Sequence, residues 1–217
     1  MNRRTFLASG VAAAAVPSLA QLPAASVAAP AAAPASLFTD PDFGYAALNA
    51  LGQTYYHAGN PGKLLAILSH IKAGDYESAW AAFHQAGTEA RALADSAAAK
   101  RHNVSAREAF LWAASSFSIA LRFGDGTENP ERMLPCYQQY ADCWSAAAAL
   151  FDPPIERLEI PYEGGSLTGW FLSADKSRHP RPLVIVNNGA DGMEISSYVL
   201  GAAGALARGY NCLIFNG

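Results

Sequence analysis

The chain has 217 residues, of which 51% are hydrophobic and 15% charged, and its formal net charge is -3. This length allows one large domain or two small ones, and the aromatic content is sufficient for a packed core. The low charge, with no basic cluster after the N-terminal region, excludes a nucleic-acid-binding surface. We expect no cofactor and no metal site, because no cysteine–histidine cluster has metal-binding spacing.

The first 28 residues have the pattern of an export signal. Arg3 and Arg4 precede Phe6 and an uncharged, alanine-rich run, which resembles a twin-arginine signal with its cationic start and short apolar segment. The sequence therefore predicts that residues 1–28 are a signal peptide read by the twin-arginine translocation machinery, with a periplasmic or secreted location. Residues 29–40 are rich in alanine and proline and are predicted to form a linker.

Three cysteines are present, Cys136, Cys143 and Cys212. The first two fall on one predicted helix, where two turns separate them by roughly 10 Å. This separation is too large for a disulfide bond. An odd number of cysteines without paired spacing also argues against a disulfide framework, so we interpret them as small buried hydrophobic residues.

Residues 41–152 carry apolar side chains at helical spacing and are predicted to form a cap-like helical segment. Asp75 is the predicted N-cap of one helix, and Ser105 with Glu108 has the pattern of a capping box that opens the next. A further apolar stripe comprises Leu134, Tyr137, Ala141, Trp144 and Ala148. We interpret the stripes as core, and the alternative is that some of their aromatic residues line a substrate pocket.

After Pro154 the hydrophobic period changes from helical to alternating. Residues 155–172, with turn residues in the middle, predict a β-hairpin. The continuous β-branched run at 182–187 predicts a strand covered on both faces. A helix is predicted from about residue 192 to 208, and residues 210–215 predict another strand. Strand, helix and strand with short connections indicate a crossover in a parallel sheet.

The turn between that strand and helix covers residues 188–192. Asp191 and Glu194 have the spacing of a capping box, so we interpret them as helix caps rather than catalytic groups. The alternative for the turn is a generic strand-to-helix connection in any doubly wound sheet, including that of a nucleotide-binding protein. The turn does not fit the glycine pattern of a dinucleotide-binding loop.

Together these elements resemble the first half of an α/β-hydrolase domain. The stretches 75–80 and 105–111 are similar to the subgroup with an N-terminal helical region, the 2,6-dihydroxypseudooxynicotine hydrolase-like serine esterases. The resemblance covers about residues 41–217 and implies an α/β fold. In that fold, the helical segment is followed by about four strands of a hydrolase sheet, in a partial domain at 153–217.

The resemblance also implies a site. In that family, the turn after the third strand supplies one backbone N–H of the oxyanion hole, which stabilises negative charge on the attacked carbonyl oxygen. The corresponding residues here are Asn188, Gly189 and Ala190, with Ala190 as the implied donor. The implied activity is that of a hydrolase acting on an ester or an activated carbon–carbon bond of a small-molecule substrate.

The sequence contains no Gly-x-Ser-x-Gly nucleophile elbow. Ser166 comes nearest to the pattern but falls in the predicted hairpin turn, while Ser196 and Ser197 fall inside a predicted helix without flanking glycines. We therefore expect the 217 residues to be the N-terminal part of a longer exported hydrolase. By themselves they are expected to be inactive and poorly stable.

A second hypothesis is an exported helical interaction module fused to a non-catalytic α/β remnant. Residues 72–80 resemble the first helix of a tetratricopeptide repeat, but no second copy occurs at the expected period. The sequence is compatible with a homo-oligomer. It identifies neither the substrate nor the signal cleavage site.

Overall fold

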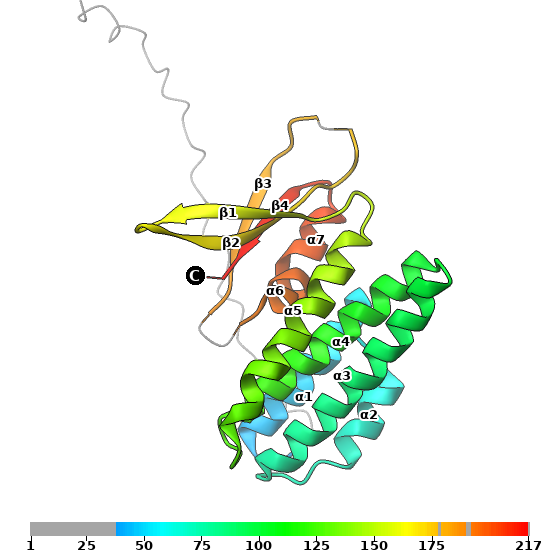
Figure 1. Cartoon of the computed structure of the whole chain (residues 1–217), viewed down its shortest axis with the longest axis vertical. Coiled ribbons are helices and arrows are strands. Elements are labelled where there is room, and N and C mark those ends of the chain that lie inside the picture. The colour runs from blue at the N-terminus through cyan, green and yellow to red at the C-terminus, as the bar shows by residue number, and fades with distance from the viewer. Residues whose placement is uncertain (1–37, 178, 190–191, 217) are drawn as a thin grey trace, which may run out of the picture. The chain divides into compact units, whose positions relative to one another are not determined.

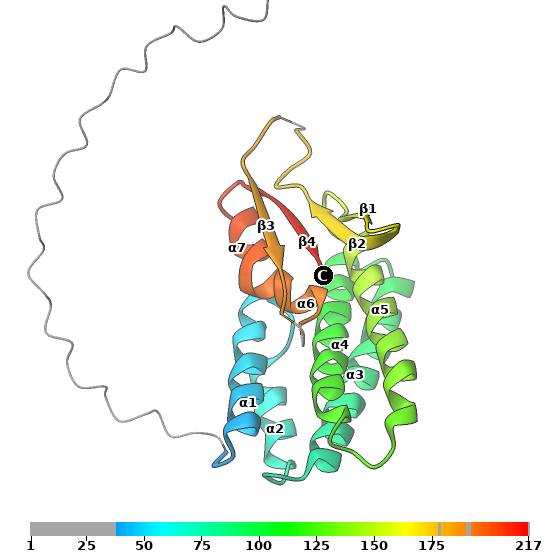
Figure 2. The same ribbon diagram turned by 90° about the vertical axis from the view of Figure 1, so that its left-hand side faces the viewer.

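The computed structural model describes residues 38–177, 179–189 and 192–216. The predicted signal at 1–28 and most of the predicted linker lie outside these residues. In the described part, long helices form a bundle, and one sheet stands at its end with a broken helix beside it (Figure 1, Figure 2). The elements, in chain order, are α1 (Pro41–Gln53), η1 (Thr54–Tyr56), α2 (Pro61–Ser69), α3 (Tyr76–Ala99), α4 (Asn103–Gly124), η2 (Pro130–Arg132), α5 (Met133–Ala149), β1 (Glu156–Tyr162), β2 (Gly165–Leu172), β3 (Leu183–Asn187), α6 (Glu194–Ser197), η3 (Tyr198–Ala202), α7 (Ala203–Leu206) and β4 (Asn211–Phe215).

The helices α3 and α4 form the centre of the bundle. Asp75 caps α3 as predicted, because its side chain accepts a hydrogen bond of 2.9 Å from the amide of Ser78. Gly87 on α3 faces Phe117 on α4, and a Cβ at Gly87 would lie 2.8 Å from the phenylalanine ring. The missing side chain therefore lets the two helices pack closely around a fully buried aromatic residue.

The predicted capping box at Ser105 and Glu108 is wrong. The helix α4 already begins at Asn103, after His102, and no side chain caps it. Arg101 has a positive φ of 60°, so the chain reverses direction directly after α3 and the next helix starts early. Glu108 lies 3.6 Å from the imidazole of His57 instead of reaching back to the helix start.

The buried face of α5 is confirmed in its second half, where Trp144 and Ala148 are buried as predicted, and differs from the prediction in its first half. Leu134 is 75% exposed and Tyr137 is 44% exposed. The buried face consists of Cys136, Tyr140, Cys143, Trp144, Ala147 and Ala148. On this face the small side chains of the cysteines and alanines lie between the large rings of Tyr140 and Trp144. All three cysteines are free and buried, as predicted.

The predicted hairpin is confirmed, since β1 and β2 pair antiparallel from Glu156 with Phe171 to Tyr162 with Gly165. Glu163 and Gly164 form the turn with positive φ of 44° and 80°, which suits a two-residue hairpin connection. Within the described residues the strand order is β1-β2-β4-β3. β2 pairs antiparallel with β4, and β3 pairs parallel with β4, as the predicted crossover requires.

The two faces of the sheet are buried to different extents. One face packs on helices and carries Trp170, Leu172, Cys212 and Ile214, each at most 7% exposed. On the opposite face, Ile185 of β3 is 60% exposed and Leu183 is 49% exposed. The prediction that β3 is covered on both faces is therefore wrong for the described residues, because no described helix packs on the second face.

The crossover between β3 and β4 is not one regular helix. α6 leads into the π-helical turn η3, which is followed by α7. Gly209, with φ of 80°, ends the segment as predicted. Asp191 of the predicted capping box lies outside the described residues. Glu194, its predicted partner, is buried and contacts Tyr140 of α5. Among the described residues, no helix is long and apolar enough to cross a membrane.

Candidate functional site

The turn after β3 lies at the carboxyl ends of two parallel neighbours. The side-chain amide of Asn188, just beyond β3, donates a hydrogen bond to the side-chain oxygen of Asn216, just beyond β4. The backbone N–H of Gly192 donates to the carbonyl of Gly189 over 2.9 Å. These bonds fix both ends of the turn. Asn188 and Gly189 are thus described, whereas Ala190, the implied oxyanion donor, lies outside the described residues.

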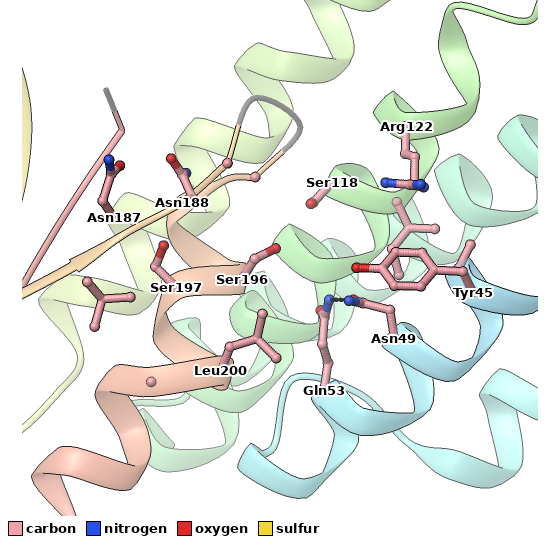
Figure 3. A pocket seen from close by; sticks show the side chains of 16 residues that line it. Tyr45, Asn49, Gln53, Ser118, Arg122, Asn187, Asn188, Ser196, Ser197 and Leu200 are labelled. Atoms are coloured by element: carbon pink, nitrogen blue, oxygen red, sulfur yellow. Dashed lines mark hydrogen bonds between the residues drawn. The ribbon is translucent and has the colours of Figure 1, made fainter. Parts of the chain in front are cut away.

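A cavity of about 430 Å³ opens beside this turn. Its walls come from α1 and α4 of the helical segment, from the end of β3, and from α6 and η3 (Figure 3). The labelled side chains around it are Tyr45, Asn49, Gln53, Ser118, Arg122, Asn187, Asn188, Ser196, Ser197 and Leu200. A cavity at the carboxyl ends of parallel strands is the usual position of a ligand site in an open α/β sheet.

A chain of hydrogen bonds fixes the wall that the helical segment contributes. The hydroxyl of Ser115 on α4 donates to the side-chain oxygen of Gln53 over 2.5 Å. The amide nitrogen of Gln53 donates in turn to the side-chain oxygen of Asn49 over 2.6 Å. Gln53 is only 3% exposed, so this chain joins α1 to α4 in the interior. Because the oxygen of Asn49 accepts this bond, its own NH₂ group remains a donor at the cavity.

Arg122 is the only charged residue among the described residues that line this cavity. Its guanidinium lies over the ring of Tyr45, 5.0 Å from the ring centroid. This contact between α4 and α1 orients a planar cation at the cavity wall. With the neighbouring hydroxyl and amide groups, it makes the wall rich in hydrogen-bond donors.

Ser197 of α6 lies below the turn. It is 3% exposed, and its hydroxyl has no hydrogen-bond partner in the structure. Figure 3 shows this hydroxyl directed from the crossover segment towards the end of β3 and Asn188. A buried hydroxyl without a partner costs stability, and it is the kind of group that an ordered water molecule or a ligand satisfies.

Tyr140 of α5 joins the helical segment to the first residues of α6. Its hydroxyl donates to the Oε2 atom of Glu194 over 2.5 Å and accepts a bond of 3.3 Å from the amide of Ile195. Tyr140 is 1% exposed and Glu194 is 7% exposed. Burial and, after it, the negative charge of Glu194 raise the pKa of Tyr140 well above its ordinary value.

Sequence reasoning placed the turn but missed the residues that surround it. Gln53 and Tyr140 occupy core-facing positions of their helices, and a buried amide or phenol needs a partner. This requirement could have been recognised in the sequence, but it does not show which distant residue is the hydrogen-bond partner. Among the described residues, no group of three or more histidine, cysteine, aspartate or glutamate side chains is positioned to hold a metal ion.

Comparison with curated proteins identifies homologues with related names. The chain is 31% identical over 185 residues to hydrolase LUC6 of Fusarium sp, covering 83% of this chain and 44% of that protein. It is 32% identical over 190 residues to 20-hydroxy-prefusarin hydrolase FUS2 of Gibberella moniliformis, again covering 83% and 44%. It is also 32% identical over 161 residues to α/β hydrolase gkaG of Penicillium citrinum, covering 72% and 37%.

The fold comparison agrees. The solved structure of 2,6-dihydroxy-pseudo-oxynicotine hydrolase matches with a TM-score of 0.61 at 20% identity, covering 76% of this chain and 45% of that one. No family model matches the chain. The chain spans less than half the length of the curated relatives it matches. Its homologues are nevertheless α/β hydrolases, and the fold of the described residues is that of an α/β hydrolase, as the sequence predicted. The matched structure, 2,6-dihydroxy-pseudo-oxynicotine hydrolase, bears the name of the subgroup that residues 75–80 and 105–111 resemble.

Proposed function

We propose that the complete protein is an exported serine hydrolase of the α/β-hydrolase fold. The observation that carries this proposal is the turn after β3, which forms one edge of a cavity of about 430 Å³. The names of the homologues support hydrolysis as the reaction class. The twin-arginine pattern at residues 1–28 supports export through the translocation machinery to the periplasm or beyond.

In the proposed mechanism, a serine attacks a substrate carbonyl and a histidine takes up its proton. The negative charge that develops on the carbonyl oxygen is stabilised by the backbone N–H of Ala190 and by a second N–H near the nucleophile. Residues 1–217 contain no nucleophile elbow, and in this proposal the attacking serine lies outside them. The 217 residues alone contribute the scaffold, the substrate cavity and half of the oxyanion hole.

The substrate is proposed to be a small organic molecule with an ester or an activated carbon–carbon bond next to a carbonyl group. The cavity volume, at the low end of the range for small-molecule sites, supports a compact substrate. Two matched proteins are named as hydrolases of organic compounds, 20-hydroxy-prefusarin and 2,6-dihydroxy-pseudo-oxynicotine. The helical segment supplies α1 and α4 to the cavity wall and so selects among substrates.

The proposal is tested on the product of the complete gene. We expect a fluorophosphonate probe to label one serine in a Gly-x-Ser-x-Gly sequence outside residues 1–217, and substitution of that serine to abolish labelling and ester hydrolysis. The 217-residue chain serves as a control that is not labelled. A complete product that contains no such serine, or that is labelled nowhere, would contradict the proposed function.

The oxyanion donor is tested separately at Ala190. Ala190→Pro removes the backbone N–H and is expected to lower kcat about 100-fold or more, the usual effect of losing one oxyanion donor. Ala190→Ser keeps the N–H and is the matched control, with kcat close to that of the unmodified protein. Equal kcat values for the two variants would show that this N–H does not stabilise the transition state.

A further inference from the structure

We propose that Tyr140 is a positioning residue for the candidate oxyanion turn, through its hydrogen bonds to Glu194 and Ile195. This inference rests on the proposed function and deepens it, because it assigns the helical segment a role in the chemistry besides lining the cavity. The proposed role concerns the geometry of the turn, and Tyr140 itself does not touch the substrate.

The first turn of α6 is capped from another helix. The first N–H groups of a helix have no partner within the helix and are normally capped by a side chain from the preceding residues. Met193 occupies the N-cap position of α6 and offers no such side chain. The hydroxyl of Tyr140, which belongs to another part of the chain, accepts from the amide of Ile195 instead. A residue of α5 therefore caps α6.

Glu194 depends on the same hydroxyl group of Tyr140. Its side chain is almost completely buried, and a carboxyl group in this position requires strong hydrogen-bond donors. Tyr140 supplies such a donor at 2.5 Å. One hydroxyl thus accepts from the backbone and donates to the side chain of adjacent residues in α6. This arrangement fixes both the position and the rotation of the first turn of the helix.

The residues that Tyr140 binds lie next to the turn along the chain. Glu194 directly follows the turn, whose other end is fixed by the bond between Asn188 and Asn216. Gly192 closes the turn with its bond to the carbonyl of Gly189. β3 is held in the sheet and α6 is held by Tyr140, so the described residues on both sides of positions 190 and 191 are fixed. Backbone N–H groups stabilise an oxyanion only when they are fixed in advance, and small displacements reduce the rate strongly.

Tyr140→Phe in the complete gene product is the first test. The substitution removes one hydroxyl and almost no volume. We expect kcat to fall roughly 10-fold to 100-fold while KM changes by less than about twofold, because the cavity wall is unchanged and only the turn is displaced. Tyr137→Phe, on the same helix at a 44% exposed position, is the matched control and is expected to leave both constants unchanged.

A second pair of variants separates positioning from simple stabilisation. Glu194→Gln keeps an acceptor for the hydroxyl of Tyr140 and is expected to retain kcat within about threefold. The double variant Tyr140→Phe with Glu194→Leu replaces both buried polar groups and is expected to recover much of the thermal stability lost in Tyr140→Phe. Its kcat is expected to stay low, because the N–H of Ile195 still lacks its partner. Recovery of kcat together with stability would overturn the inference.

The outcomes also distinguish this inference from the proposed function. If the complete product hydrolyses esters and Tyr140→Phe has an unchanged kcat, the inference is wrong and the proposed function stands. If the complete product has no hydrolase activity, the proposed function fails, and hydrogen exchange in the 217-residue chain decides the structural role. There, Tyr140→Phe is expected to accelerate exchange at Gly192 and Ile195 more than 10-fold relative to the amides of α3, and uniform exchange would overturn the role.

Discussion

The covered and the open face of the sheet carry similar side chains and differ in burial. Val184 and Val186 of β3 point to the helices and pack against the core, whereas Leu183 and Ile185 on the same strand are about half exposed or more. On the neighbouring strand, Cys212 and Ile214 are fully buried. The comparison shows that residue type gives a strand its hydrophobicity, while the elements packed on each face decide how much of it is buried.

The two faces of the sheet also have different structural roles. The covered face holds the crossover segment against β3 and β4 and thereby positions the turn beside the cavity. The open face, with Leu158, Leu183 and Ile185 all at least 36% exposed, contributes little to the core of the described residues. An exposed apolar surface of this kind is typical of a face that another protein element covers. Variants on the two faces are expected to differ accordingly.

The largest effect is expected for Ile214→Ala on the covered face. Ile214 is 0% exposed, and truncation of a fully buried isoleucine leaves a cavity as well as removing buried apolar surface. The free energy of unfolding is expected to fall by about 2–5 kcal/mol, measured by urea denaturation of the 217-residue chain. A loss below about 1 kcal/mol would mean that the helices do not pack on this face in solution.

A smaller effect is expected for Gly201→Val in η3. A Cβ at Gly201 would lie 3.0 Å from a methyl group of Val186, so larger side chains force the crossover segment away from β3. Overpacking at such a contact costs about 1–3 kcal/mol. Gly169→Ala is the control on the open face, where the Cβ would lie 2.8 Å from the Cδ1 atom of Ile160, the movable end of a flexible and partly exposed side chain. The control is expected to change the unfolding free energy by less than about 0.5 kcal/mol, and equal costs for both would contradict the comparison.

The next expected effect is a loss of unfolding free energy through the buried thiols, which is absent at neutral pH and appears only in alkaline solution. Burial raises the pKa of Cys136 and that of Cys143 from 9.0 to about 12. Because the folded-state pKa is raised, these thiols stabilise the fold fully below pH 9, and their contribution is lost as the pH rises towards about 12. The unfolding free energy is therefore expected to decline over this interval.

The decline can be assigned by comparison with a double variant, Cys136→Ala with Cys143→Ala. The double variant is expected to have a shallower slope of unfolding free energy against pH above about 9. Some slope remains, because burial and Glu194 also raise the pKa of Tyr140. Identical slopes for the two proteins would show that the thiols are not shielded from water by the helices.

The features that the sequence predicted correctly depend on neighbouring residues. The cap at Asp75, the hairpin turn at Glu163 and Gly164, and the stop at Gly209 each follow from local backbone preferences. The parallel crossover follows from the order of the elements. In these cases the residues that interact are close in the sequence, so their types were sufficient.

The features that were predicted wrongly or missed depend on tertiary contacts. Glu194 has the spacing of a capping residue, but Tyr140 binds it from another helix. The bond between Ser115 and Gln53 joins residues that lie far apart in the sequence, so no local pattern announces it. The exposure of one face of β3 was also not predictable from local sequence. Its β-branched run is typical of a strand that is covered on both faces, and only the packing of other elements decides whether both faces are covered. The sequence predicted the turn of the candidate site. The residues of α1, α4, α6 and η3 that surround the turn were identified only from the packing of the folded chain.

The smallest effect is expected for Ile185→Ala on the open face, which makes the same chemical change as Ile214→Ala one strand away. Ile185 is 60% exposed, so truncation removes little buried surface and leaves no enclosed cavity. In the 217-residue chain the loss of unfolding free energy is expected to be below about 1 kcal/mol. The same substitution in the complete gene product tests most directly whether the open face is buried in that protein. A cost there close to that of Ile214→Ala would show that this face is buried against another part of that protein, whereas a small cost in both would leave the apolar face exposed to solvent.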